Sequence, residues 1–287
     1  MWRYALDAAH DGLVEVGNGA EVWCWDSGGV GETVVLAHAH TGNYLSWAHQ
    51  VPALAAQGFR IIAWSRRGYF RSSPLVADDA GTQADDLAAL LDARGVAQAH
   101  LVGVAAGGAS VLDMALSYPH RALSVCAASS LMGLDDPQFR ARVSILTADW
   151  FRALPPEAKE LGAGFRSFSP EGVAEWARLQ ALNPPVAAPK GTRFLQQPLR
   201  TDITTAGLGR CPVPVLLMTG AADAYMPPRL LRQVAFEAGI DRVTVFEDAA
   251  HAPHVEAPEA FNAALVAFFR ASSPGRSTAA EPDGLDI

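Results

Sequence analysis

The sequence predicts an α/β fold: a mainly parallel, doubly wound sheet with helices on both faces and a helical cap inserted into it. Two observations support this prediction. Short continuous apolar runs alternate with segments of helical periodicity, as parallel strands and their crossover helices do. One long region then interrupts the alternation with helical segments alone, which indicates an insertion.

The strands are predicted from their apolar patterns. Alternating polar and apolar residues over 20–26 predict a half-buried edge strand. Continuous apolar runs predict strands that helices cover on both faces. These runs lie at 33–38, 60–64, 100–104, 122–128, 213–219 and 243–246.

The helices are predicted from their end signals. Thr82 and Asp85 have the spacing of an N-cap and its N3 partner, which predicts a helix over 82–94. Pro119 ends a second helix over 106–118, and Pro258 begins a third near the end of the chain.

These elements divide the chain into a core, a cap and a tail. Residues 1–134 and 211–271 form the α/β core, and 135–210 form the helical cap. The cap is expected over the carboxyl edge of the sheet, where open α/β sheets bind ligands. The alternative is a small second domain with no role at the site. Residues 272–287, rich in Ser, Pro, Gly and charge, are expected to be a disordered tail.

Composition and charge exclude several function classes. A net charge of −8 without a block of Lys or Arg argues against a nucleic-acid partner. No long apolar run predicts a membrane span, so we expect a cytoplasmic protein without a membrane partner. The three cysteines, far apart in the sequence, are expected to be buried free thiols. We expect neither a metal nor a cofactor, and a homodimer stays open.

The turn after the run at 100–104 has the glycine spacing of a nucleophile elbow. In this G-x-S-x-G turn the central side chain projects from a strained bend between strand and helix, and its neighbours must be small. Gly103 and Gly107 occupy the flanking positions, but the centre is Ala105, which carries no nucleophilic atom.

Three further loops are predicted at the same edge of the sheet. Asp223 follows the run at 213–219, and His251 follows the run at 243–246. His40 follows the run at 33–38, where backbone N–H groups can form half of an oxyanion hole. The chain order nucleophile, acid, histidine is the order of an α/β hydrolase.

With these motifs the chain resembles the α/β-hydrolase superfamily, in the branch with a helical cap. The resemblance covers residues 14–270. The segment 38–42 stands where the family has His-Gly-x-Pro-Gly, and 65–72 is similar to its Asp-x-Arg-Gly-x-Gly-x-Ser loop. The departures in these two loops are Ala39, Thr41, Ser65 and Phe70.

The resemblance implies a role for each site residue. A serine at position 105 would attack an acyl carbon, His251 would act as base, and Asp223 would hold the histidine tautomer. The backbone N–H groups of His40 and Ala106 would face the oxyanion. Asp248 is a rival acid, although its closeness in sequence to the histidine makes the geometry awkward.

Ala105 leaves two interpretations open. An engineered Ser→Ala replacement would leave an inactive or nearly inactive hydrolase, and the intact motifs around Asp223 and His251 favour this. A natural alanine would indicate either a ligand-binding pseudoenzyme or a His–Asp dyad, as in cofactor-free dioxygenases or C–C bond chemistry. Epoxide hydrolysis would need Asp at this position.

The expected substrate is a hydrophobic carboxylic ester or lactone of moderate size, because the cap is rich in aromatic residues. We expect the substrate-binding wall to include aromatic and histidine side chains. These are His40, Trp150, Phe151, Phe165, Phe168, Trp176 and His254.

Overall fold

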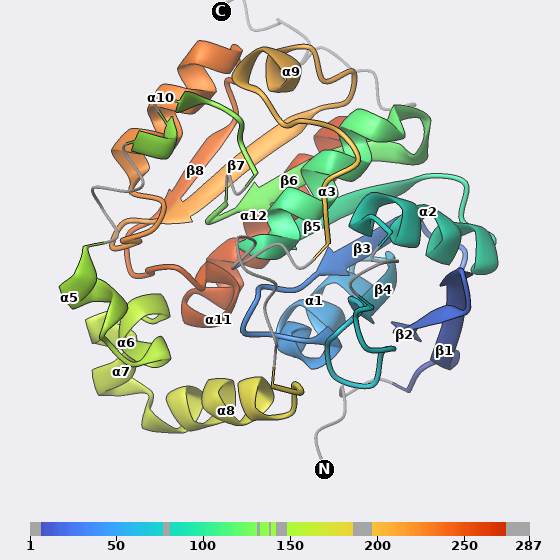
Figure 1. Cartoon of the computed structure of the whole chain (residues 1–287), viewed down its shortest axis with the longest axis horizontal. Coiled ribbons are helices and arrows are strands. Elements are labelled where there is room, and N and C mark those ends of the chain that lie inside the picture. Colours follow the sequence, from blue (N-terminus) through green and yellow to red (C-terminus); the bar gives the residue numbers. More distant parts are fainter. Residues whose placement is uncertain are drawn as a thin grey trace, which may run out of the picture.

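The computed structural model describes residues 7–76, 81–130, 133–137, 139–141, 148–185 and 197–273. Within them, one eight-stranded sheet has the order β1-β2-β4-β3-β5-β6-β7-β8 (Figure 1). The strands are β1 (His10–Gly17), β2 (Ala20–Asp26), β3 (Thr33–Ala37), β4 (Arg60–Ser65), β5 (Ala99–Val104), β6 (Ala122–Ala128), β7 (Val215–Gly220) and β8 (Val243–Phe246). Strands β3 to β8 are parallel, which confirms the predicted sheet.

The amino-terminal edge of the sheet differs from the prediction. Residues 20–26 form β2, but this strand is not an edge, because β1 pairs with it antiparallel and β4 pairs with its other side. The pattern of β1 is hard to recognise, since only Val14 and Val16 are buried in a largely exposed strand. The turn between β1 and β2 contains Gly17 and Gly19, both at positive φ.

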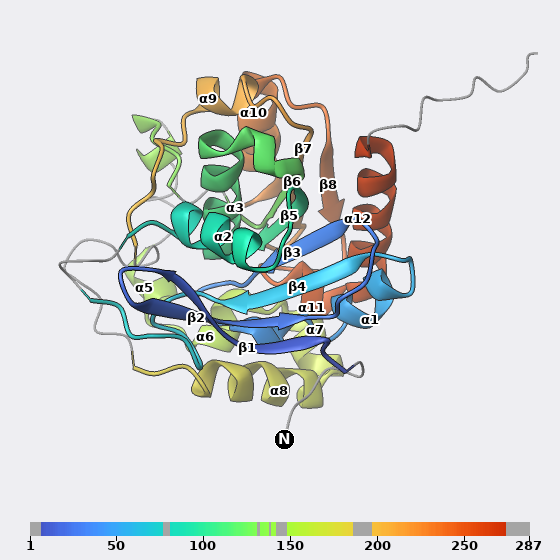
Figure 2. The same ribbon diagram turned by 90° about the vertical axis from the view of Figure 1, so that its right-hand side faces the viewer.

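Helices cover both faces of the sheet (Figure 2). On one face α2 (Gln83–Ala93), α3 (Ala106–Ser117) and α10 (Pro228–Ala238) share one apolar cluster with the strands. On the other face α1 (Gln50–Ala55) and α12 (Pro258–Ser272) share a second cluster. The doubly wound arrangement is therefore confirmed.

The central strand β5 shows how the two faces divide the core. All six of its residues are buried. Leu101 packs into the cluster under α2 and α3, whereas Val102 and Val104 pack into the cluster under α1 and α12. A strand buried on both faces needs apolar residues at every position, which explains the continuous run in the sequence.

The helix signals read from the sequence correspond to observed ends. The Thr82 side chain accepts the backbone N–H of Asp85 at 3.1 Å, and α2 begins at the next residue after Thr82. Helix α3 ends at Ser117, and a short 3-10 helix, η3 (Pro119–Arg121), follows it. Helix α12 begins at Pro258 as predicted.

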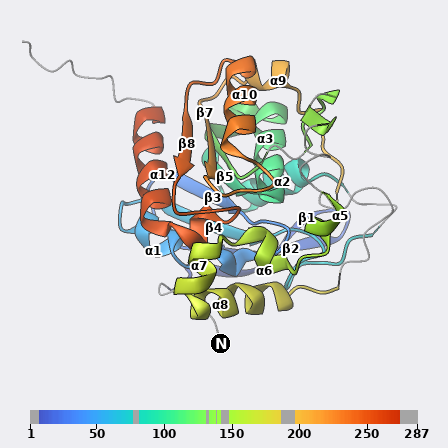
Figure 3. The ribbon, with the colours of Figure 1, turned by 90° about the vertical axis from the view of Figure 1, so that its left-hand side faces the viewer.

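Four helices of the inserted region lie together beyond the carboxyl ends of the strands (Figures 1 and 3). They are α5 (Asp149–Arg152), α6 (Pro156–Glu160), α7 (Ala163–Phe168) and α8 (Pro170–Ala181), and we call them the cap helices. Helix α9 (Thr205–Gly209) falls within the predicted cap range but packs on α10 of the core. Of the predicted tail, 274–287 lie outside the described residues.

The described residues contain no helix long and apolar enough to cross a membrane. All three cysteines are free in the structure. Cys24 and Cys126 are buried and Cys211 is partly buried.

Candidate active site

The site is built around a strained turn between β5 and α3. Ala105 lies immediately before α3 with φ of 50° and ψ of −117°, a conformation that L-residues adopt only at a cost. Its N–H donates to the carbonyl of Ala128 on β6 at 2.9 Å, and its own carbonyl accepts the N–H of Gly108 at 2.9 Å. Backbone bonds on both sides therefore hold the bend, whatever the side chain at position 105.

The glycines around Ala105 are required by close backbone approach. A β-carbon on Gly103 would come within 2.1 Å of the carbonyl oxygen of Gly107. A β-carbon on Gly107 would come within 2.0 Å of the carbonyl oxygen of Ala37 at the end of β3. The helix thus contacts both strands below it, which is the small-residue requirement of a nucleophile elbow.

Asp223 lies in the loop after β7 and is 2% exposed. Its Oδ1 accepts the backbone N–H groups of Tyr225 at 2.8 Å and Met226 at 2.9 Å, and its Oδ2 accepts the hydroxyl of Thr219 at 3.0 Å. Burial alone would raise its pKa, but the adjacent His251 and these hydrogen bonds lower the pKa below the usual value. Asp223 is therefore an ionised, fixed carboxylate.

His251 lies in the loop after β8 and is held from both sides. Its Nδ1 is 3.0 Å from each carboxylate oxygen of Asp223, which favours the tautomer with Nδ1–H and leaves Nε2 as the base. Burial opposes the charged ring, but Asp223, with Glu160 and Glu256 nearby, raises the pKa of His251 above its usual value. The acid and the histidine read from the sequence therefore form a dyad.

The loop after β3 supplies the other side of the site. The Nδ1 atom of His40 is 2.9 Å from the hydroxyl of Tyr69, and burial, with Arg66 nearby, lowers the pKa of His40 to about 4. Ala106 is the first residue of α3, where backbone N–H groups have no acceptor within the helix. The two predicted oxyanion donors thus lie in adjacent loops, because β3 and β5 are parallel neighbours.

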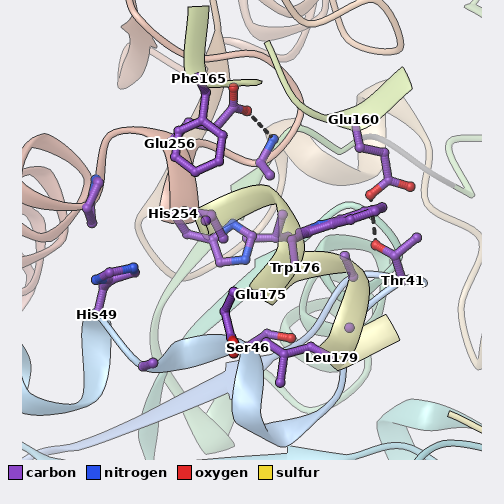
Figure 4. Close-up of a pocket in the computed structure, with 18 of the residues that line it drawn as sticks. Thr41, Ser46, His49, Glu160, Phe165, Glu175, Trp176, Leu179, His254 and Glu256 are labelled. Atoms are coloured by element: carbon purple, nitrogen blue, oxygen red, sulfur yellow. Dashed lines mark hydrogen bonds between the residues drawn. The ribbon is translucent and has the colours of Figure 1, made fainter. Parts of the chain in front are cut away.

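A cavity of about 520 Å³ opens beside His251, between the cap helices and the core. Its floor includes Ala39, Leu45 and Val104 from the core, and its opposite wall comes mainly from α8. Figure 4 shows Trp176 and Leu179 of that helix facing the cavity from one side. The cavity is large enough for a small organic ligand.

Only part of the predicted substrate wall lies in this cavity. Phe165, Trp176 and His254 line it. Trp150 and Phe168 are 70% and 91% exposed and lie outside it, because α5 and α7 are short helices that turn these side chains to solvent. The remaining predicted wall residues, Phe151 and His40, pack instead on Tyr225 and Tyr69.

Sequence reasoning missed the residues that attach the cap to the histidine loop. The carbonyl of Glu160, at the end of α6, accepts the N–H of His251 at 3.0 Å, and its Oε2 accepts the hydroxyl of Thr41 at 2.7 Å. The Glu256 carboxylate accepts the N–H of Gly162 at 2.6 Å and the N–H of Ala252 at 3.0 Å. Nothing in the local pattern distinguishes these glutamates from ordinary surface carboxylates.

A strained turn, a buried carboxylate–histidine pair and a cavity at the carboxyl edge of the sheet define the α/β-hydrolase class of site. Residues 34–264 match the sequence model of the alpha/beta hydrolase family. The chain belongs to this family.

Individual relatives match this chain over most of their own length. A protein named RutD from Caulobacter sp. (strain K31), a candidate carbamate hydrolase, is 30% identical over 261 residues, which cover 83% of this chain and 90% of RutD. The structure is similar to that of a thermophilic esterase from Thermogutta terrifontis, with a TM-score of 0.72, 22% identity, and coverage of 92% of this chain and 99% of the esterase.

The enol-lactonase from Burkholderia xenovorans LB400 is a further structural neighbour. It has a TM-score of 0.69 and 21% identity, and the match covers 89% of this chain and 99% of the lactonase. At such low identity the two solved structures share the fold with this chain, and they carry no statement about its substrate.

Proposed function

We propose that this fold is built for the hydrolysis of a carboxylic ester or lactone by acyl transfer, with position 105 as the nucleophile position. In this proposal a serine at 105 attacks the acyl carbon and His251 takes its proton. Asp223 stabilises the imidazolium, and the N–H groups of His40 and Ala106 receive the oxyanion. The family match over residues 34–264 and the relative named as a candidate carbamate hydrolase support hydrolytic chemistry.

The observation that carries the proposal is the strained conformation of Ala105 at the same edge of the sheet as an intact Asp223–His251 dyad. The backbone at position 105 has a φ of 50°, which costs free energy and gives an alanine side chain no interaction in return. In the family's elbow the same conformation presents the nucleophile. Because the chain has alanine there, it lacks the attacking atom. We therefore propose that it binds the substrate and turns it over hardly at all.

A second candidate function uses the dyad alone. His251 has a carboxylate partner and an elevated pKa without any hydroxyl at position 105. Such a base can remove a proton from a bound substrate, as cofactor-free dioxygenase or C–C bond chemistry requires. The same pocket without chemistry would serve a ligand-binding protein.

The test restores the hydroxyl with Ala105→Ser. Both forms are assayed on a series of p-nitrophenyl esters and on a lactone panel, and both are treated with a serine-directed phosphonate. In a comparable triad, loss of the serine costs on the order of a millionfold in turnover, so the serine form should be far more active and should be labelled.

If the serine form is neither labelled nor more active on any substrate, acyl transfer is excluded. Substrate-dependent oxygen uptake by the unaltered chain would then support the dyad function. The fold should tolerate the substitution, because serine and alanine are close in size and backbone hydrogen bonds hold the turn at position 105.

A further inference from the structure

The cavity beside His251 has an acidic lining. Four glutamates line it, while its lining includes no lysine or arginine among the described residues. Glu256 is already committed to backbone N–H groups of the cap and the histidine loop, and Glu171 is exposed. Glu160 and Glu175 are the two remaining carboxylates of the lining that could contact a ligand.

Glu160 is a partly buried carboxylate without a cationic side chain bound to it. Among the described residues, its side chain makes one hydrogen bond, from the neutral hydroxyl of Thr41 at 2.7 Å (Figure 4). Burial raises its pKa, against the opposing effects of His251, Thr41 and Lys159. A buried carboxylate is stabilised by a cation in direct contact with it, so a cationic ligand group would gain by binding there.

Two buried polar atoms of residues that line the same cavity lack hydrogen-bond partners within the described part of the chain. The Oε1 atom of Glu175 is buried without a hydrogen bond, while its Oε2 accepts Arg178 at 2.5 Å. His254 is 4% exposed and its Nδ1 also lacks a hydrogen bond. Burial lowers the pKa of His254 to about 3, so this ring is neutral and does not offset the acidic lining.

Aromatic side chains form the apolar part of the same wall. Trp176 and Phe165 line the cavity together with Glu160. Leu161, the residue after Glu160, packs in one cluster with Trp176, so the end of α6 lies against α8, and Glu160 and Trp176 line the same cavity from these two helices. A carboxylate beside an indole is the combination that attracts alkylammonium groups, through charge and through cation–π contact.

We propose that the substrate of this pocket is an ester or lactone that carries a cationic amine, an inference that rests on the proposed function. Glu160 and Trp176 would bind its ammonium group. The apolar walls accommodate its hydrocarbon part. An anionic ligand would be repelled by the glutamates. A purely hydrocarbon ligand would remove water from Glu160 without placing a cation in contact with it.

The test uses the full chain, which lacks the nucleophile and should hold an ester uncleaved. Calorimetry compares benzoylcholine with its neutral isostere, in which a tert-butyl group replaces the trimethylammonium group. We expect benzoylcholine to bind about tenfold more tightly. Glu160→Gln keeps an acceptor for Thr41 and should remove most of this preference, leaving the affinity for the neutral ester within about twofold.

Two further variants separate charge from packing. Glu157→Gln lies on the same helix outside the cavity lining and should leave both affinities unchanged. Trp176→Leu should weaken benzoylcholine more than the neutral ester, because leucine fills space without an aromatic face. Thermal unfolding of each variant verifies that the cap is intact.

The outcomes separate this inference from the proposed function. Equal affinities for the two esters, or a preference that survives Glu160→Gln, would overturn the inference even if Ala105→Ser hydrolyses neutral esters. Selective, Glu160-dependent binding of benzoylcholine would support it even if Ala105→Ser is inactive, in which case only the acyl-transfer proposal fails.

Discussion

The main-chain carbonyl of Glu160 accepts the backbone N–H of His251 at 3.0 Å, so a cap residue and the histidine of the dyad share a direct hydrogen bond. The loop that carries His251 is therefore positioned by the cap as well as by β8. Any movement of α6 would change both the wall of the cavity and the placement of the base.

The dyad should determine turnover in the form with a restored serine. In the Ala105→Ser background, Asp223→Asn should lower kcat by about 10⁴-fold, since an amide no longer selects the Nδ1–H tautomer or stabilises the imidazolium. Asp248→Asn is the matched control, because Asp248 is exposed and the carboxylate that contacts His251 is that of Asp223. A larger loss in the Asp248 variant would reverse the assignment of the acid.

Activity of the Ala105→Ser form should rise with pH, because His251 acts as a base only when it is neutral. Since Asp223 and Glu160 raise the pKa of His251, the midpoint of kcat/KM should lie above about 6.5. Glu160→Gln removes one negative charge that favours the protonated ring, so its midpoint should move to lower pH. A pH–rate profile of both forms measures this, and an upward shift would contradict it.

The elbow should be intolerant of a methyl group at Gly107. Gly107→Ala would place a β-carbon 2.0 Å from the Ala37 carbonyl oxygen and 2.7 Å from that of His38, so the backbone must move. We expect a loss of about 2–4 kcal/mol in the free energy of unfolding, measured by urea denaturation. Gly164→Ala, with nothing within 4 Å of its β-carbon, should be neutral or slightly stabilising.

Glu256 should fasten the cap to the histidine loop. Its carboxylate accepts the N–H groups of Gly162, Ala250 and Ala252, and Glu256→Ala leaves these three donors without an acceptor. We expect a loss of about 2–3 kcal/mol in stability, with faster amide exchange at Gly162. Glu247→Ala removes an exposed carboxylate from the same loop region and should change stability by less than about 0.5 kcal/mol.

The sequence alone determined the parallel sheet and the positions of Ala105, Asp223 and His251. Each of these depends on a local signal. An apolar run marks a strand buried on both faces, and glycine spacing marks a turn in which backbones approach closely. Loops after parallel strands must meet at one edge, so chain order was enough to place the acid and the histidine at the same edge as the elbow.

Only the tertiary structure decided which cap residues face the cavity. The orientation of the cap helices depends on contacts with one another and with the core, so composition could not separate Trp176, which lines the cavity, from Trp150, which is 70% exposed. Glu160 likewise has an unremarkable local sequence. Its burial, its bond to Thr41 and its contact with His251 come from segments far apart in the chain, and such long-range contacts leave no mark on local periodicity.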